Sequence, residues 1–99
     1  MAEFDHKAID EVIHGRLRLA IMAYLSSVAA TDFTSLKRET GTTDGNLSVH
    51  LRKLEEAGYV ESKKSFVGRK PKTTLTLSKE GRAAWIAYLD QLNTMIDRA

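Results

Sequence analysis

A cluster of cations is the first feature of this chain that could bind a ligand. The segment from Ser62 to Thr74 contains no acidic residue, and its cations are Lys63, Lys64, Arg69, Lys70 and Lys72. The first 14 residues are instead acidic, so the net charge of +2 conceals an uneven distribution. A basic block favours a polyanionic partner, although an ordinary solvated loop can have the same composition. Lysines on an exposed hairpin also discourage aggregation, and the two roles are compatible.

The stretch DGNLSVHLRKLEE, residues 44–56, has the pattern of an amphipathic helix with an apolar residue on its polar side. At about 100° per residue, three leucines share one face, and Val49 points almost directly away from them. The leucines are Leu47, Leu51 and Leu54. The outward arc contains Gly45, Asn46, Val49, Arg52, Lys53 and Glu56, with Ser48 at its margin.

This outward arc has the chemistry of a helix that reads base edges. Asparagine pairs well with adenine and arginine with guanine, and an outward Val49 can pack on a thymine methyl group. Gly45 costs the helix about 1 kcal/mol relative to alanine, which a close approach to DNA can offset. The alternative is a solvated face whose N-terminal glycine frays, but the cations downstream favour DNA. The predicted DNA-contact set on this helix is Thr43, Asp44, Gly45, Asn46, Ser48, Val49, Arg52 and Lys53.

Cations would position a duplex without reading its sequence. Arg52 and Lys53 lie one turn beyond the first base-contacting residues, where such a helix meets phosphate. Arg69 is the candidate for insertion into the minor groove, because a narrow groove concentrates negative potential. The four lysines of the basic segment are then predicted to contact phosphates.

Three residues near the N-terminus have a spacing that could ligate a metal ion. His6, Asp10 and His14 are spaced at four-residue intervals and would share a face if that segment were helical. A solvated helical face has the same pattern and is the favoured interpretation, so no metal site and no cofactor are predicted. His50 lies beside the leucine stripe, where a half-buried packing role is favoured over base contact. No nucleophile with a base, paired carboxylates or glycine-rich phosphate loop accompanies them, which argues against an enzyme.

The length and composition describe one folded domain. The chain has 99 residues, of which 42% are hydrophobic and 28% charged, and this suffices to bury one core. The absence of cysteine excludes disulfides and thiolate zinc sites. The sequence opens MAEFDHKAIDE without a basic and apolar leader, and no apolar run is long enough to span a bilayer. We therefore expect no membrane partner and a cytoplasmic location.

The elements that must position these residues follow from periodicity and capping signals. An apolar stripe at mostly four-residue spacing predicts a first helix within residues 9–28. Asp32 is placed to cap a short second helix that ends at Gly41, and Thr43 to cap a third helix that ends before Gly58. So tight a turn between two helices indicates a helix-turn-helix.

The periodicity then changes from helix to strand. Residues 59–67 and 73–77 are rich in β-branched and aromatic residues, and Gly68 and Pro71 are predicted to bound the loop between them. These segments should pair as an antiparallel hairpin with a basic tip, followed by a last helix capped by Ser78. The expected fold is mainly α with a small β-hairpin (α+β), a winged helix-turn-helix with the order α-α-α-β-β-α.

Two stretches of the sequence also resemble a known group of regulators. GNLSVHLRKLEEAGYVES, followed by GRKPKTTLTLSKEGRAAW, is similar to the short winged-helix transcriptional regulators related to the MarR and ArsR families, and the similarity covers residues 13–96. The resemblance implies a regulator whose third helix enters the major groove of double-stranded DNA and whose wing reaches the flanking backbone or minor groove. It also implies a homodimer on inverted repeats. The chain lacks the long extra helices of full-length MarR proteins, so inducer binding is not carried over and no effector is assigned.

The predicted organisation has three parts. Residues 1–14 form an arm ahead of a break at Gly15, residues 15–78 form the DNA-binding domain, and residues 79–99 form a C-terminal helix for dimerisation. Trp85 and Leu89 can pack within one chain, whereas distal apolar residues favour a two-fold dimer with recognition helices about 34 Å apart. The predicted interface is Ile9, Ile13, Tyr88, Leu92, Met95 and Ile96. The alternative function, a winged helix that binds proteins instead of DNA, is disfavoured by the basic wing.

Overall fold

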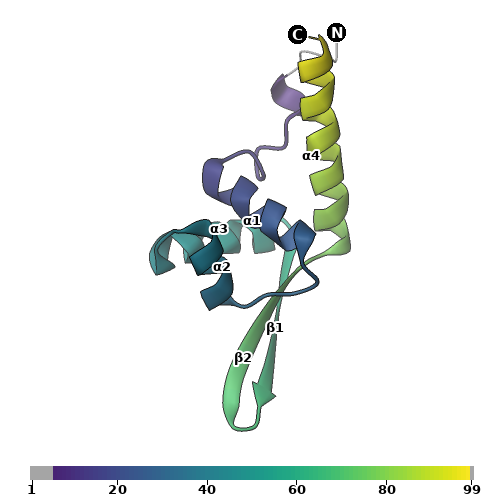
Figure 1. The fold of residues 1–99 in the computed structure, drawn as a ribbon. Coiled ribbons are helices and arrows are strands. Elements are labelled where there is room, and N and C mark those ends of the chain that lie inside the picture. The colour runs from purple at the N-terminus through teal and green to yellow at the C-terminus, as the bar shows by residue number, and fades with distance from the viewer. Residues whose placement is uncertain (1–5, 99) are drawn as a thin grey trace.

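The helices and strands occur in the expected α+β winged-helix order. The computed structural model describes residues 6–98, which begin with a short 3-10 helix, η2 (His6–Ala8). The other elements are α1 (Arg16–Ser27), α2 (Phe33–Thr40), α3 (Asp44–Glu56), β1 (Val60–Val67), β2 (Lys70–Leu77) and α4 (Lys79–Arg98). The first three α-helices gather in one body, from which the β1–β2 hairpin projects at one end and α4 at the other (Figure 1). None of the helices within these residues combines the length and the apolar character needed to cross a membrane.

Side-chain caps define the helix-turn-helix formed by α2 and α3. The Asp32 carboxylate accepts a hydrogen bond from the Ser35 backbone N–H at 2.7 Å, and Gly41 ends α2 with a φ of 68°. Two residues later, the Thr43 hydroxyl accepts a hydrogen bond from the Asn46 N–H at 3.2 Å at the start of α3. Both predicted caps and the predicted glycine stop are confirmed. The turn that sets α3 against α2 is therefore encoded locally.

The turn of the hairpin is shorter than the sequence indicated. Only Gly68 and Arg69 separate the strands, and Gly68 supplies the positive φ, 65°, that a two-residue turn needs. The predicted loop boundary at Pro71 is wrong, because Pro71 lies inside β2 opposite Phe66. Both strands of a two-stranded sheet are edges. Hydrogen-bonded pairs alternate with non-hydrogen-bonded pairs along an antiparallel ladder, and the Phe66–Pro71 pair is of the second kind. The backbone nitrogens of this pair point away from the opposite strand, so the proline removes no hydrogen bond between the strands.

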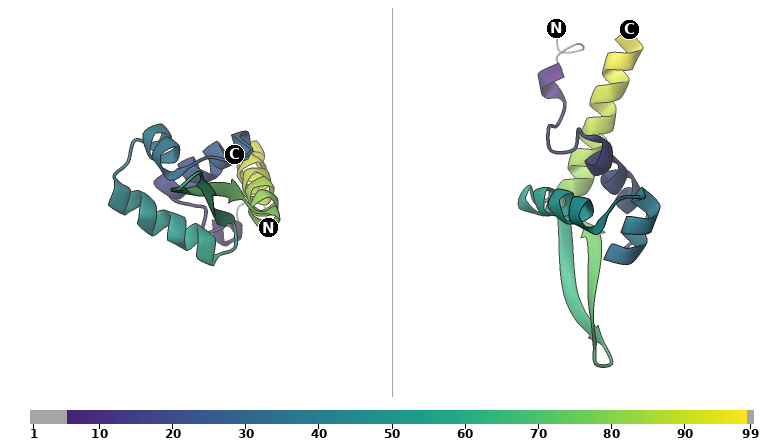
Figure 2. Two further views of the ribbon diagram at one scale, coloured as in Figure 1. Left: turned by 90° about the horizontal axis from the view of Figure 1, so that it is seen from below. Right: turned by 90° about the vertical axis from the view of Figure 1, so that its left-hand side faces the viewer.

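The segment between η2 and α1 folds as a turn and not as a helix. The Asp10 carboxylate accepts hydrogen bonds from the N–H groups of Val12 and Ile13 at 2.8 and 3.3 Å. The α1 helix begins only after Gly15, so the predicted break is confirmed. The helical face that would have gathered the three candidate metal ligands does not form, because Asp10 uses its side chain to close the turn. Figure 2 shows η2 beside the C-terminal part of α4, where the arm folds back toward that helix.

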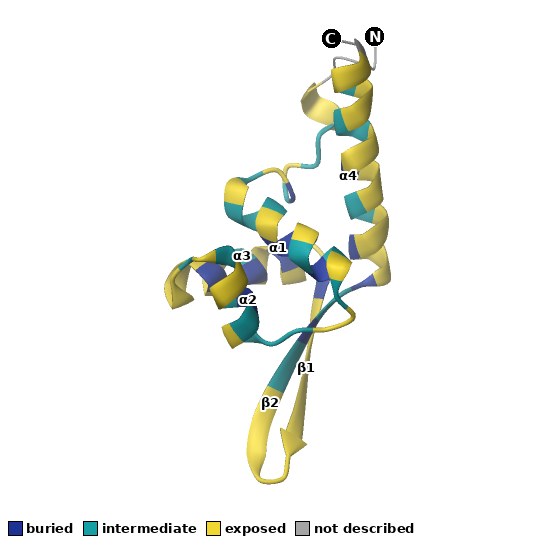
Figure 3. Ribbon diagram, in the orientation of Figure 1, coloured by how far each residue is buried: buried dark blue, intermediate teal, exposed yellow. Residues whose placement is uncertain are grey.

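One hydrophobic core joins these elements (Figure 3). It contains Ile13, Ile21, Met22, Leu25, Leu36, Leu47, Leu51, Leu54, Val60, Leu75 and Tyr88. Two of these residues, Ile13 and Tyr88, were expected at a dimer interface, and for them the prediction is wrong. Ile13 is 0% exposed and Tyr88 is 2% exposed. The arm packs on the helices of its own chain, so Ile13 of the arm is inserted into the core and Tyr88 of α4 is covered.

The junction between the hairpin and α4 is closely packed. The Ser78 hydroxyl accepts a hydrogen bond from the Gly81 N–H at 2.8 Å and donates one to the Gly58 carbonyl, so the predicted cap at Ser78 is confirmed. Gly81 lies directly against the backbone of Tyr59. A β-carbon on residue 81 would come within 2.0 Å of the Tyr59 carbonyl oxygen. Only glycine allows α4 to approach the start of β1 this closely.

Candidate nucleic-acid interface

The two sides of α3 have opposite exposure. Leu47, Leu51 and Leu54 are at most 4% exposed, whereas Val49 is 51% exposed. The other residues of the predicted outward arc are exposed as well: Gly45, Asn46, Ser48, Arg52, Lys53 and Glu56. The division of the helix into a buried side and an outward side is therefore confirmed. Contact of the outward side with DNA remains a prediction.

An ion pair ties the start of α3 to α2. The Lys37 ammonium lies 2.7 Å from the Asp44 carboxylate. The side chains are 42% and 71% exposed, so the pair contributes under about 1 kcal/mol to stability. Its larger effect is on charge, because a free carboxylate at this position would repel a DNA phosphate. Asp44, a member of the predicted DNA-contact set, carries a charge that Lys37 compensates.

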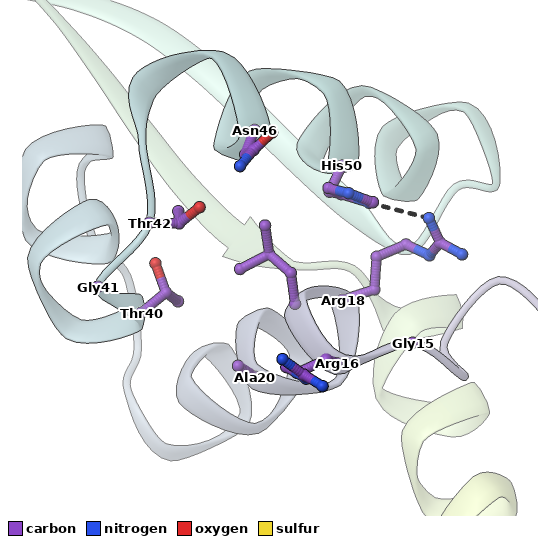
Figure 4. A pocket seen from close by; sticks show the side chains of 10 residues that line it. Gly15, Arg16, Arg18, Ala20, Thr40, Gly41, Thr42, Asn46 and His50 are labelled. Atoms are coloured by element: carbon purple, nitrogen blue, oxygen red, sulfur yellow. Dashed lines mark hydrogen bonds between the residues drawn. The ribbon is translucent and has the colours of Figure 1, made fainter.

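A hydrogen bond joins the inner margin of α3 to α1. The Arg18 guanidinium donates through Nη1 to Nδ1 of His50 at 2.9 Å (Figure 4). Burial, together with the charges of Arg18 and Lys53, lowers the pKa of His50, so the ring is neutral at pH 7. Since a guanidinium can only donate, the proton of the neutral ring lies on Nε2.

Arg18 also connects α3 to the arm. Its Nε donates a hydrogen bond to the Val12 carbonyl at 2.5 Å, so one side chain bonds the arm and the recognition-helix candidate together. The partly buried position predicted for His50 is confirmed. The bond to Arg18 was not predicted, because no local pattern pairs residues that are 32 positions apart.

A hollow of about 650 Å³ lies between α1 and the turn that enters α3. Thr42, Asn46 and His50 line one side and Arg16 the other, and no acidic residue contributes to the lining (Figure 4). Arg16 is exposed and places a cation beside α3. A helix in the major groove is flanked by the backbones of both DNA strands, so Arg16 is a candidate phosphate contact. Arg16 is absent from the predicted contact set because it belongs to another helix and lies outside the basic segment.

The register of the hairpin sorts the cations of the wing onto two faces. Residues that pair across the ladder share a face, which places Lys63, Lys70 and Lys72 on one face and Lys64 on the other. Arg69 occupies the turn between the strands. All five are exposed, and Figure 3 shows the exposure continuing along the outer part of the hairpin. Cations on both faces and at the tip can meet phosphates on either side of a groove.

One face of the wing continues into a groove beside α3. Ser48 and Arg52 of α3 and Ser62 and Thr73 of the hairpin line this α3–wing groove, which has a volume of about 390 Å³. Ser62 also donates a hydrogen bond to the Glu55 carboxylate at 3.4 Å. Arg52 thus stands at the junction between the helix and the wing, with open space beside it.

The three candidate metal ligands near the N-terminus do not converge. The Tyr59 hydroxyl donates to the Asp10 carboxylate at 2.6 Å, and Nδ1 of His14 lies 2.9 Å from the Tyr88 hydroxyl oxygen. The bond to Asp10 raises the pKa of Tyr59 to about 12, and burial raises the pKa of Tyr88. His6 belongs to η2 and lines the same hollow as His14, whereas Asp10 is turned to Tyr59. Among the residues that the structure describes, no three histidine or acidic side chains gather in a way that could hold a metal ion.

The α4 helix carries apolar surface that its own chain leaves uncovered. Ile86, Leu89 and Ile96 are 55%, 41% and 67% exposed. The exposure of Leu89 differs from the packing within one chain that the sequence suggested for it. Trp85 does pack against the core, and it stacks on Tyr88 with ring centroids 5.8 Å apart.

Beyond this surface, the arm and the distal part of α4 enclose a hollow of about 380 Å³. Its apolar lining residues, Ile9, Leu92 and Met95, all belong to the predicted dimer interface. These three residues and Ile96 are the predicted interface residues that one chain leaves at least partly exposed, so they can still contact a second chain.

Comparison with known proteins gives the same architecture. A family model described as a winged helix DNA-binding domain matches residues 17–96. An uncharacterized protein from Methanocaldococcus jannaschii is 37% identical over 82 residues, which are 83% of this chain and 89% of that protein. The solved structure of a transcriptional regulator homologue from Pyrococcus horikoshii has a TM-score of 0.87 at 28% identity and covers 98% of this chain and 96% of its own. A transcriptional regulator of the MarR family from Enterococcus faecalis has a TM-score of 0.74 at 28% identity, over 88% of this chain and 77% of its own.

Proposed function

The chain belongs to the winged helix DNA-binding domain family, and we propose that it is a sequence-specific transcriptional regulator that binds double-stranded DNA. Its family and its fold, which resembles that of MarR-type regulators, indicate a regulator of transcription and not an enzyme. The observation that carries the proposal is the exposed polar side of α3 beside a projecting basic wing. In the major groove, Asn46 can bond to a base edge while Val49 packs on a thymine methyl group. Arg52 and Lys53, one turn further along α3, meet the phosphate backbone. Arg69 and the wing lysines reach the flanking backbone or minor groove.

Fluorescence anisotropy with a random-sequence duplex at low salt tests DNA binding. If a dimer makes about six to ten phosphate contacts, affinity should fall by about 10³ to 10⁵ between about 50 and 200 mM salt. Arg52→Gln should weaken binding. Arg82→Gln removes the same charge from an exposed position on α4 and serves as the matched control. Binding that is absent or independent of salt would contradict the proposal and favour a winged helix that binds proteins.

The second part of the proposal is a homodimer built from α4 and the arm. Residues 79–99 and the arm would form the two-fold interface, and residues 15–78 would present two α3 helices about 34 Å apart to an inverted repeat. Because DNA is the partner, we expect a cytoplasmic location. Sedimentation equilibrium at micromolar concentration should show a dimer. Ile96→Arg should yield monomers, whereas Thr94→Arg, at an exposed position on the opposite side of α4, should not. A monomeric wild type would contradict this part alone.

A further inference from the structure

Two large apolar side chains are exposed to solvent near the tip of the wing. Phe66 is 73% exposed and Val67 is 63% exposed. Phe66 lies opposite Pro71, one pair below the Val67–Lys70 pair that closes the turn. Phe66 takes no part in the hydrophobic core, so its ring is available for contact with a partner.

The register of the hairpin decides which way Phe66 faces. Side chains alternate along a strand, so Phe66 shares a face with Lys64 and Ser62, while Val67 lies on the opposite face. Ser62, with its neighbour Thr73 on β2, lines the α3–wing groove. Phe66 is therefore on the side of the wing that continues the surface of α3.

The charges around Phe66 select the partner. Lys64 shares the face of Phe66 and Arg69 lies at the turn, whereas Lys70 and Lys72 project from the opposite face of the wing tip, and no acidic residue lies between Ser62 and Thr74. A surface that combines a cationic rim with one exposed ring complements a nucleic acid, whose phosphates flank flat apolar bases. We therefore assign the partner of this face as the same DNA duplex that α3 would read.

We infer that Phe66 is an apolar wedge that enters the minor groove beside the α3 site, inserts its ring between two stacked base pairs and kinks the duplex there. This inference rests on the proposed DNA-binding function. The strands of the wing are about 4.8 Å apart between backbones, so the ribbon cannot lie deep in an undistorted minor groove about 6 Å wide. Its narrow tip and one side chain can enter. Inserted apolar side chains unstack a base step and kink the duplex toward the major groove.

The wedge has two consequences that phosphate contacts lack. Its contribution to affinity does not depend on salt, because no counterion is released by an uncharged ring. It also favours pyrimidine–purine steps in the flanks of the site, since these steps unstack most easily. Sequence preference would therefore extend beyond the bases that α3 contacts.

The test uses a duplex of about 40 base pairs enriched from a random pool on the purified protein. Permanganate attacks unstacked thymines, and energy transfer between end labels reports the bend. With the wild type, we expect reactive thymines at one step in each flank and a bent duplex. Phe66→Ala should abolish both signals and weaken binding by about 5- to 150-fold, the range for loss of one stacked aromatic side chain. Phe66→Leu should keep most of the effect, because aliphatic wedges also insert.

Val67→Ala is the matched control, since it removes an exposed apolar side chain from the opposite face. It should keep the reactive step and the bend. All three variants should retain the thermal midpoint of the wild type, because the replaced side chains lie outside the core. The wedge is overturned if the wild type leaves every thymine stacked, if Phe66→Ala keeps the reactive step, or if Val67→Ala abolishes it equally.

The wedge and the proposed function fail in different ways. Salt-sensitive binding that Arg52→Gln weakens, together with a Phe66→Ala variant that behaves like the wild type, overturns the wedge and leaves the DNA-binding function standing. A wild type that binds no duplex overturns both.

Discussion

Replacing Val49 with alanine tests whether the exposed side of α3 reads DNA. The side chain is 51% exposed and points away from three buried leucines, so its truncation opens no cavity in the core. Alanine also has the higher helix propensity, by about 0.5 kcal/mol. The free energy of unfolding should therefore change by less than about 0.5 kcal/mol.

The expected loss of DNA affinity follows from the surface that Val49 still exposes. Removing two methyl-sized groups from a fully buried position costs about 1.6 kcal/mol, at about 0.8 kcal/mol each. Roughly half of the side chain is already covered in the free protein. Contact with DNA would bury the rest and contribute about 0.8 kcal/mol per chain, or about 1.6 kcal/mol per dimer. Losing this contribution in Val49→Ala should weaken the affinity for the operator by about 15-fold.

Urea unfolding and fluorescence anisotropy on an enriched duplex measure the two effects separately. Leu51→Ala is the matched comparison on the same helix, because Leu51 is 4% exposed. It should lower the free energy of unfolding by about 2 to 5 kcal/mol. If Val49→Ala instead destabilises the protein by more than about 1 kcal/mol and leaves the affinity unchanged, the assignment of the two sides of α3 is refuted.

Three further substitutions test the packing and the titrating groups. Gly81→Ala should lower the free energy of unfolding by about 1 to 3 kcal/mol in urea although alanine is the better helix former, because its β-carbon would meet the Tyr59 carbonyl oxygen; an unchanged value would contradict the packing. The pKa of Tyr59 is raised to about 12, so its contribution to stability is complete below pH of about 10 and is lost between about pH 10 and 12; unfolding as a function of pH should show that Tyr59→Phe lacks this loss. The pKa of His50 is lowered from 6.5, so its contribution is complete above that value and is lost as the pH falls below it. His50→Gln, which can still accept from Arg18, should flatten the dependence of stability on pH between about 7 and 5, and an equal slope in both proteins would contradict the assignment.

The features that sequence patterns predicted correctly are those with local causes. Thr43 caps α3 through a bond to a residue three positions away, and Gly41 ends α2 through its own backbone angle. The outward position of Val49 follows from helical periodicity alone. Each of these depends on interactions within a few residues, which a single sequence contains in full.

The errors concern residues whose surroundings come from distant parts of the chain. Ile13 and Tyr88 have the apolar character of an interface, but apolar character alone does not distinguish contact with another chain from contact within the same one. Pro71 favours a loop by composition, but β2 accommodates it because the two-residue turn at Gly68 and Arg69 sets a register that pairs Pro71 with Phe66. The bond between Arg18 and His50 joins residues 32 positions apart.

The sequence by itself determined the order of the elements, the caps that separate α2 from α3, and the division of α3 into a leucine side and a polar side, because capping and periodicity act over short distances along the chain. Tertiary structure alone decided which wing residues share a face with the α3–wing groove, that Arg16 lies beside α3, and which apolar residues are buried where the arm packs on the helices. These outcomes depend on hairpin register and on how helices pack, and both are set by contacts between segments that are far apart in the sequence.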